Sequence, residues 1–126
     1  MTKTAIDLFC GAGGLSAGLE MAGFRVLAGN DCFEAAGKTF SATHPNAQFI
    51  AGPIEALSVE QLMTVTRLKK GELTVLVGGP PCQAYSVYNH KRGMHDRRAT
   101  LFREYLRIVE GMQPEWIVME NVKGIY

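Results

Sequence analysis

Five short apolar segments alternate with amphipathic helical segments along the chain. The apolar segments are residues 5–9, 25–29, 47–50, 73–78 and 115–120, and residues with helical spacing occupy 14–22, 33–42, 58–69 and 100–111. Apolar runs without an alternating polar face are typical of parallel strands that are buried on both faces. Strands that alternate with helices also favour a sheet covered by helices on both sides. The sequence therefore predicts an α/β fold with a doubly wound parallel sheet.

This arrangement also predicts where the chemistry lies. In doubly wound sheets, ligands bind at the carboxyl ends of the strands, near the point where the strand order reverses. We therefore expect functional residues directly after Phe9, Gly29 and Gly78, and at Glu120. Helix ends are also predicted, with Ser58 as an N-cap and Gly23, Gly71 and Gly111 directly after helix C-termini.

Composition narrows the class of protein. A chain of 126 residues, of which 47% are hydrophobic and 20% charged, predicts one globular domain spanning residues 1–126. The net charge of +1 argues neither for nor against a nucleic-acid partner. Three cysteines without a C-x-x-C pair fit neither a disulfide framework nor a zinc site, so we expect no metal. The chain shows no signal peptide and no membrane-length apolar run, which predicts a cytoplasmic protein without a membrane partner.

A glycine-rich turn follows the first predicted strand. Gly11, Gly13 and Gly14 allow a tight turn, and the next helix would offer free N–H groups to a ligand. Ser16 stands at the sixth position of the dinucleotide pattern G-x-G-x-x-G, so that fingerprint is incomplete. Asp31, after the second strand, is placed to accept hydrogen bonds from ribose hydroxyls. The turn fits either a cofactor site or a plain strand-to-helix connection.

The segment Gly-Gly-Pro-Pro-Cys-Gln, residues 78–83, follows the fourth predicted strand. Pro80 and Pro81 restrict the backbone, so they would hold the Cys82 thiol in a defined direction at the functional edge of the sheet. A thiolate there is a soft nucleophile if neighbouring N–H groups or cations lower its pKa. We expect Cys10 and Cys32, in contrast, to be buried structural cysteines.

Two further features lie at the same predicted edge. Glu120 ends the last strand, where a carboxyl group can share a proton with a ring nitrogen, and the Asn121 amide can orient a base or a loop. A solvated strand cap is the alternative for this acid. The one dense basic patch, residues 90–98, suits phosphate contacts or is a solvated loop; it contains His90, Lys91, Arg92, His95, Arg97 and Arg98.

Together these motifs resemble the DNA (cytosine-5) methyltransferases. Residues 7–24 are similar to the first motif of that family, residues 78–86 to its Pro-Cys-Gln motif and residues 120–122 to its Glu-Asn-Val motif. The resemblance covers essentially the whole chain, but only the N-terminal part of the family's catalytic domain. It implies a Rossmann-like fold, truncated after the fifth strand, and transfer of a methyl group from S-adenosylmethionine to C5 of a cytosine, with S-adenosylhomocysteine as the product.

The resemblance also assigns roles to residues. Cys82 would add to C6 of a cytosine flipped out of double-stranded DNA, Glu120 would act at N3, and Asn121 would position the base and the Cys82 loop. DNA contacts fall to Gln83, Ser86, Arg97 and Arg98. The cofactor-binding positions are Phe9, Gly11, Ala12, Gly13, Gly14, Asp31, Ile54, Pro81 and Leu101.

Two positions depart from the family pattern. Asp31 stands where the family more often has Glu, and Pro53 stands where it usually has an Asp that binds the adenine amino group. Proline has no side-chain acceptor, so adenine recognition there must use a backbone carbonyl or another residue, or be weaker.

The later motifs of the family, including the target recognition domain, are absent from these 126 residues. Residues 117–119 would also lie near an unprotected sheet edge. We therefore expect a truncated or split lobe that does not methylate DNA alone and that a second chain or a missing C-terminal half completes. A non-catalytic cofactor-binding module and a tRNA cytosine-5 methyltransferase are the alternatives. The absence of regulatory domains favours a bacterial or phage modification system, and the target DNA sequence is not encoded here.

Overall fold

The computed structural model describes residues 2–80 and 97–120, with the side chains of 97–99 excepted. Its strands are β1 (Thr4–Leu8), β2 (Arg25–Asp31), β3 (Gln48–Ala51), β4 (Val75–Gly78) and β5 (Trp116–Met119). Its helices are α1 (Gly14–Met21), α2 (Glu34–Thr43), the 3₁₀ turn η1 (Ile54–Ala56), α3 (Val59–Thr66) and α4 (Arg97–Met112). The predicted alternation of strands and helices is confirmed.

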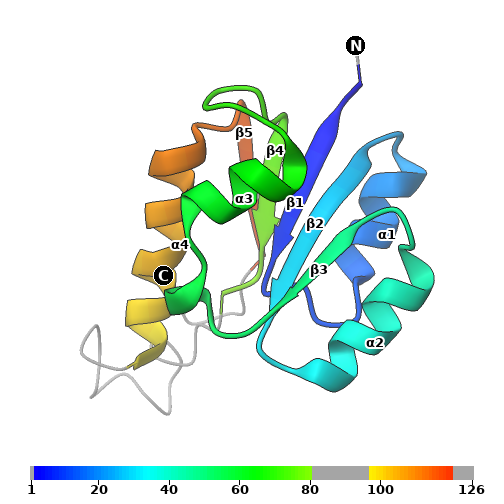
Figure 1. The fold of residues 1–126 in the computed structure, drawn as a ribbon, viewed down its shortest axis with the longest axis horizontal. Coiled ribbons are helices and arrows are strands. Elements are labelled where there is room, and N and C mark those ends of the chain that lie inside the picture. Colours follow the sequence, from blue (N-terminus) through cyan, green and yellow to red (C-terminus); the bar gives the residue numbers. More distant parts are fainter. Residues whose placement is uncertain (1, 81–96, 121–126) are drawn as a thin grey trace.

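The five strands form one parallel sheet in the order β3-β2-β1-β4-β5. The order reverses between β1 and β4, because the chain first winds outward through β2 and β3 and then returns to the other side of β1. Figure 1 shows α1 and α2 on one face of the sheet and α3 and α4 on the other. The predicted fold class is therefore correct.

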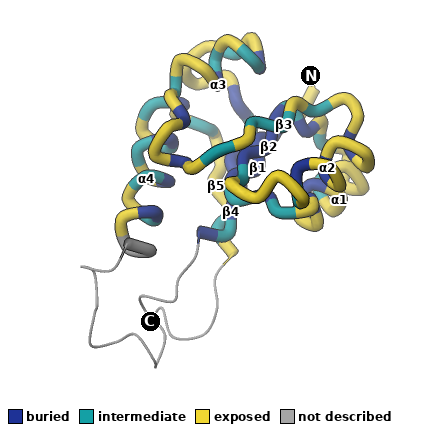
Figure 2. The backbone as a smooth tube through the Cα atoms, turned by 60° about the horizontal axis from the view of Figure 1, so that its bottom comes forward, coloured by how far each residue is buried: buried dark blue, intermediate teal, exposed yellow. Residues whose placement is uncertain are grey.

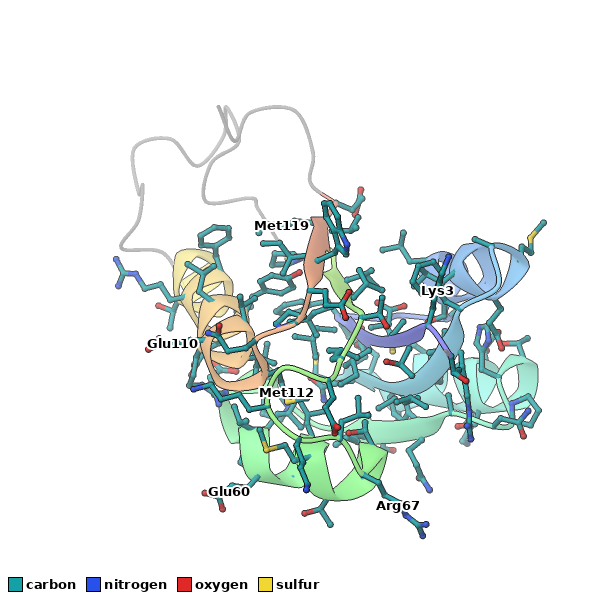
Figure 3. All side chains as sticks on the ribbon, turned by 90° about the horizontal axis from the view of Figure 1, so that it is seen from above. Lys3, Glu60, Arg67, Glu110, Met112 and Met119 are labelled. Atoms are coloured by element: carbon teal, nitrogen blue, oxygen red, sulfur yellow. The ribbon has the colours of Figure 1, made fainter. Side chains whose placement is uncertain are left out.

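Each face of the sheet has its own apolar core. On the α1 and α2 side, Phe40 packs with Ala5, Val26 and Val77. On the other side, Tyr105, Ile108 and Met112 of α4 are fully buried against the sheet and α3. In Figure 3 the labelled Met112 lies in the interior, whereas Glu60 and Arg67 extend outward. The Tyr105 hydroxyl donates a hydrogen bond of 3.1 Å to the Leu76 carbonyl, which fixes α4 on β4.

Burial differs sharply between neighbouring strands (Figure 2). All four residues of β4 are buried, whereas on β5 Trp116, Ile117 and Val118 are 70%, 45% and 48% exposed. β5 pairs with β4 and is an edge of the sheet. Within the part of the chain that the structure describes, the sheet edge expected at residues 117–119 is thus largely exposed.

The predicted helix ends are partly correct. Ser58 is the N-cap of α3 and accepts a hydrogen bond of 2.9 Å from the Gln61 amide. Gly23 follows α1 with a left-handed backbone, φ 92°. The prediction for Gly71 is wrong, because α3 ends at Thr66 and Arg67 takes the left-handed position after it, with φ 60°. The prediction for Gly111 is also wrong, because this residue lies inside α4. A Cβ atom there would stand 2.4 Å from Val59 and would disturb the packing of α3 against α4.

None of the helices in the described part of the chain is long and apolar enough to cross a bilayer.

Candidate cofactor and catalytic site

A cavity of about 210 Å³ opens at the carboxyl ends of the strands. It begins at the end of β1 with Phe9, next to the point where the strand order reverses, and it is closed on the α4 side by Leu101. Its described lining is Phe9, Asn30, Asp31, Cys32, Phe33, Gly52, Pro53, Ile54, Glu55, Gly79 and Leu101. The location agrees with the expectation for a doubly wound sheet.

The predicted cofactor-binding residues fall into three groups. Phe9, Asp31, Ile54 and Leu101 line the cavity. The glycine turn at residues 11–14 is outside the described lining, but it adjoins the cavity through the Gly11 amide, which donates a hydrogen bond to Asp31. Pro81 lies outside the described residues. The fold therefore brings four of the predicted residues to one cavity and places the glycine turn next to it.

Asp31 joins two segments of the cavity wall. Its Oδ2 accepts a hydrogen bond of 2.9 Å from the Gly11 amide, and its Oδ1 accepts one of 2.9 Å from the Phe33 amide. The carboxylate thus orients both the glycine turn and the start of α2. Each carboxylate oxygen has a second lone pair, so Asp31 can still accept hydrogen bonds from ligand hydroxyls.

Phe9 carries local backbone strain at the mouth of the cavity. Its φ is 54°, a left-handed value that is uncommon for residues other than glycine. Such conformations cluster at ligand sites, where the surrounding structure holds them in place. Here the next residue, Cys10, donates its amide to the Asn30 carbonyl at 3.0 Å, which anchors the end of β1 to β2.

A buried histidine, His44, contacts the glycine turn. His44, at the end of α2, is 3% exposed, and its Nε2 lies 3.2 Å from the Gly13 carbonyl oxygen. Its Nδ1 bonds to the Glu20 carboxylate of α1. Gly13 has φ 98°, and a Cβ atom on it would stand 2.7 Å from His44 and 2.9 Å from Phe40. Only glycine allows this close approach.

A buried carboxylate, that of Asp7, bonds to the first turn of helix α1. Asp7 on β1 accepts a hydrogen bond of 2.7 Å from the Ser16 hydroxyl through Oδ2, and the Ser16 backbone also bonds to it. Its Oδ1 has no hydrogen-bond partner among the described residues. Burial raises the pKa of Asp7 to about 6, although the Ser16 hydrogen bonds and the nearby His44 act in the opposite direction.

Glu120 lies at the same edge of the sheet, where the carboxyl ends of the strands meet. Its amide donates to the Gly78 carbonyl at 2.9 Å, directly after β5. A Cβ atom on Gly79 would stand 2.6 Å from Oε2 of Glu120, so the carboxylate lies against the cavity wall at Gly79. Figure 3 shows Met119, the residue before Glu120, at the end of β5.

The remaining predicted catalytic and DNA-contacting residues are not described. Cys82, Gln83, Ser86 and Asn121 lie outside the described residues. Arg97 and Arg98 form the first turn of α4, but their side chains are outside the description. Their assignments stay predictions.

The two other cysteines behave differently from one another. Cys10 is buried as expected, and burial raises its pKa to about 12. The expectation for Cys32 is wrong, because its side chain is exposed and lines the cavity. Cys32 follows the end of β2, where the chain turns across the open carboxyl edge of the sheet instead of continuing into the core.

Several lining residues were missed from the sequence. Asn30 is 2% exposed and donates hydrogen bonds to the carbonyls of Ile50, at 2.8 Å, and Gly52, at 3.1 Å. Its signal was a polar residue directly after an apolar strand. Phe33, Glu55 and Gly79 also line the cavity, and their only signal was closeness in sequence to predicted strand ends. Among residues 2–80 and 97–120, no cluster of His, Cys, Asp or Glu could hold a metal ion.

Comparison with known proteins agrees with the family that the sequence motifs resemble. The family model of C-5 cytosine-specific DNA methylase matches residues 3–126. The Type II methyltransferase M.NgoPII of Neisseria gonorrhoeae is 38% identical over 120 residues, which are 95% of this chain and 33% of that protein. M.AquIA of Picosynechococcus is 34% identical over 125 residues, 99% of this chain and 50% of that protein. The chain thus spans a third to a half of the length of these relatives.

Solved structures show the same fold. An Escherichia coli prophage protein, described as a candidate DNA modification methyltransferase, superposes with a TM-score of 0.83 at 31% identity, over 98% of this chain and 33% of that protein. The Dnmt2 methyltransferase of Schizosaccharomyces pombe superposes with a TM-score of 0.71 over 97% of this chain and 37% of that protein. At 20% identity, the second comparison supports the fold alone.

Proposed function

Because the chain belongs to the C-5 cytosine-specific DNA methylase family, we propose that it is the cofactor-binding and catalytic lobe of a DNA (cytosine-5) methyltransferase. The observation that carries the proposal is a single cavity bordered by Asp31, Ile54, Leu101 and Gly79, with the Glu120 carboxylate against Gly79. The Type II methyltransferase relatives support a modification enzyme of the bacterial cytoplasm.

The residues that line the cavity support S-adenosylmethionine as its ligand. Phe33, Pro53, Ile54 and Leu101 offer apolar surface for a purine, and the Asp31 carboxylate offers acceptors for ribose hydroxyls. Phe9, Ala12, Gly11, Gly13, Gly14 and Pro81 are the remaining proposed cofactor-binding positions. Bound there, S-adenosylmethionine would supply an electrophilic methyl group.

The catalytic residues of the proposal are Cys82, Glu120 and Asn121. The Cys82 thiolate adds to C6 of a flipped-out cytosine while Glu120 holds a proton at N3, which gives C5 carbanion-like character. After methyl transfer, loss of the C5 proton expels the thiolate. Asn121 positions the base and the Cys82 loop. The proximity of Glu120 to the cavity wall at Gly79 supports this arrangement.

Double-stranded DNA is the proposed substrate. Gln83 and Ser86, next to the nucleophile, and Arg97 and Arg98, at the start of α4, are the proposed contacts. The arginines would bind phosphates, and the residues beside Cys82 would contact the flipped nucleotide.

A further polypeptide segment, on the same chain or a second one, completes the proposed enzyme. The relatives are two to three times longer than the matched region, and β5 exposes Trp116, Ile117 and Val118 at the sheet edge. Exposed apolar edge strands are normally covered or paired. We propose that the additional segment packs here and carries the residues that read the DNA sequence.

Covalent trapping tests the proposal. The chain is incubated with S-adenosylmethionine and duplex DNA containing 5-fluorocytosine, with and without a separate polypeptide carrying the part of M.NgoPII that the chain does not match. We expect a denaturation-resistant protein–DNA adduct when both polypeptides are present, and none with Cys82→Ser. Binding of S-adenosylhomocysteine without an adduct in any combination would favour a non-catalytic cofactor-binding module, and an adduct only with the corresponding RNA would make the substrate RNA.

A further inference from the structure

Arg107 on α4 makes three hydrogen bonds, and two of them join this helix to the turn η1. One terminal nitrogen donates to the carbonyls of Ile54, at 3.0 Å, and Leu57, at 2.8 Å. Its Nε donates to Glu104, one turn earlier on the same helix, at 2.7 Å. The carboxylate therefore holds the guanidinium in the orientation that reaches η1.

The turn η1 forms one wall of the cavity and has little structure of its own. Ile54 and Glu55 belong to η1 and Pro53 is its N-cap, and all three line the cavity. Internally the turn has hydrogen bonds from Ala56 to Pro53 and from Leu57 to Ile54, both 3.0 Å. A single 3₁₀ turn of three residues has weak hydrogen-bond geometry and needs outside support.

Arginine is suited to this support. Its guanidinium is always charged and bonds two carbonyls and a carboxylate in one fixed plane, whereas a lysine ammonium is a flexible point charge. Arg107 and Glu104 lie outside the described cavity lining, while Leu101 of the same helix lies within it. Helix α4 therefore contacts the cavity directly through Leu101 and supports the η1 part of its wall through Arg107.

We propose that Arg107, oriented by Glu104, is a positioning residue that fixes the η1 wall of the cofactor cavity and thereby sets recognition of the nucleoside base. This inference rests on the proposed function for the identity of the ligand. Pro53 has no side-chain acceptor, so we expect this wall to contact a base through its backbone. The position of that backbone depends on the two carbonyls that accept hydrogen bonds from Arg107.

The test compares Arg107→Met with Arg103→Met, an exposed arginine one turn earlier on the same helix. Hydrogen exchange of the ligand-free protein measures the wall itself. We expect the amides of Ala56 and Leu57 to exchange at least about tenfold faster in Arg107→Met, with β1 and α1 unchanged. Arg107→Lys is expected to restore part of the protection, and Arg103→Met to resemble the wild type.

Calorimetry then measures binding of S-adenosylhomocysteine and of S-inosylhomocysteine, in which an oxygen replaces the adenine amino group. Arg107→Met should weaken binding of S-adenosylhomocysteine about tenfold and binding of S-inosylhomocysteine less. The ratio of the two affinities, which measures the preference for adenine, should therefore decrease. Loss of global stability alone would not change this ratio. If Arg107→Met fails to fold, Glu104→Gln should show the same decrease to a smaller degree.

The outcomes separate the two proposals. If the wild type binds neither ligand, the proposed cofactor is wrong, and the exchange rates alone decide whether Arg107 fixes the wall. Unchanged exchange at Ala56 and Leu57 overturns the inference. Faster exchange with an unchanged binding ratio also overturns it, because the wall would then move without affecting the base.

Discussion

The Gly11 amide and the Asp31 carboxylate are joined by a hydrogen bond of 2.9 Å across the ends of β1 and β2. The same carboxylate accepts from the Phe33 amide, so one side chain orders two segments beside the cavity. Asp31→Asn replaces one acceptor oxygen by an NH₂ group, which would face a backbone N–H. We expect it to weaken S-adenosylhomocysteine binding about 10- to 100-fold, because a charge-assisted contact is lost along with the orientation of the turn.

Calorimetric titration of Asp31→Asn measures this loss. Glu60→Gln is the matched control, because Glu60 lies on the outer surface of α3, away from the cavity (Figure 3). Equal affinities for the two variants would show that the Asp31 carboxylate does not take part in binding.

Buried Asp7 predicts a pH dependence of stability. Its pKa is raised from 3.8 to about 6 in the folded protein, so the folded state holds its proton more tightly than the unfolded chain does. The free energy of unfolding therefore falls as the pH rises from about 4 to above 6, by about 3 kcal/mol for this group. Asp7→Asn removes the titration and can still accept a hydrogen bond from Ser16.

Urea unfolding of the wild type and Asp7→Asn at pH 4 and pH 7.5 isolates this contribution. The wild type should lose more stability than the variant between the two pH values, and other titrating groups cancel in the difference. A difference that is constant with pH would mean that Asp7 keeps an ordinary pKa in the folded protein.

Gly13 and Gly14 are adjacent, but only Gly13 lies where a side chain would clash with its neighbours. Gly13 has φ 98° and would bring a Cβ atom to 2.7 Å from buried His44, whereas a Cβ atom on Gly14 would meet nothing within 4 Å. Gly13→Ala should lower the free energy of unfolding by about 2 to 4 kcal/mol, from backbone strain and overpacking. Gly14→Ala, at the first position of α1, should stay within about 0.5 kcal/mol of the wild type. Similar losses in urea unfolding of both variants would contradict the contact between His44 and the turn.

Local sequence patterns predicted the strands of the sheet well but not the side-chain hydrogen bonds between segments that are distant in sequence. Strands were recognisable because apolar runs report burial on both faces, but the predicted second strand stopped at residue 29, two residues short of the end of β2. Asn30 is polar by type and yet buried, since Ile50 and Gly52 accept its amide hydrogens. These partners lie 20 and 22 residues away, so no local pattern reveals them.

The candidate site shows the same limit. Asp31 and the glycine turn were predicted as site residues because both stand at the ends of apolar strands. The bonds from His44 to Gly13 and from Arg107 to η1 join residues 31 and about 50 positions apart, and depend on how α2 and α4 pack. Cys32 was misplaced because cysteine is buried on average, while this one follows a strand at the open edge of the sheet.

The cysteines predict a simple pattern of chemical reactivity. In Cys82→Ser, an aromatic disulfide reagent at pH 8 should modify exposed Cys32 within minutes and buried Cys10 only after unfolding, because burial raises the Cys10 pKa to about 12. S-Adenosylhomocysteine should slow the reaction of Cys32, since this residue lines the cavity. The double variant Cys32→Ser/Cys82→Ser should then show no rapid reaction. Rapid modification of Cys10 in the native protein would contradict its burial.

Trp116 provides a direct reporter for the proposed completing segment. It is the only tryptophan of the chain and is 70% exposed on β5. If a further polypeptide covers this edge, the fluorescence maximum of Trp116 should shift to shorter wavelength when that polypeptide, with its own tryptophans replaced by phenylalanine, is added. Exposed Ile117→Lys should weaken the association, because a charge would be buried without a partner, whereas Lys69→Ala, in the turn after α3, should not. Adduct formation with DNA in the absence of any spectral shift would place the completing segment elsewhere on the molecule.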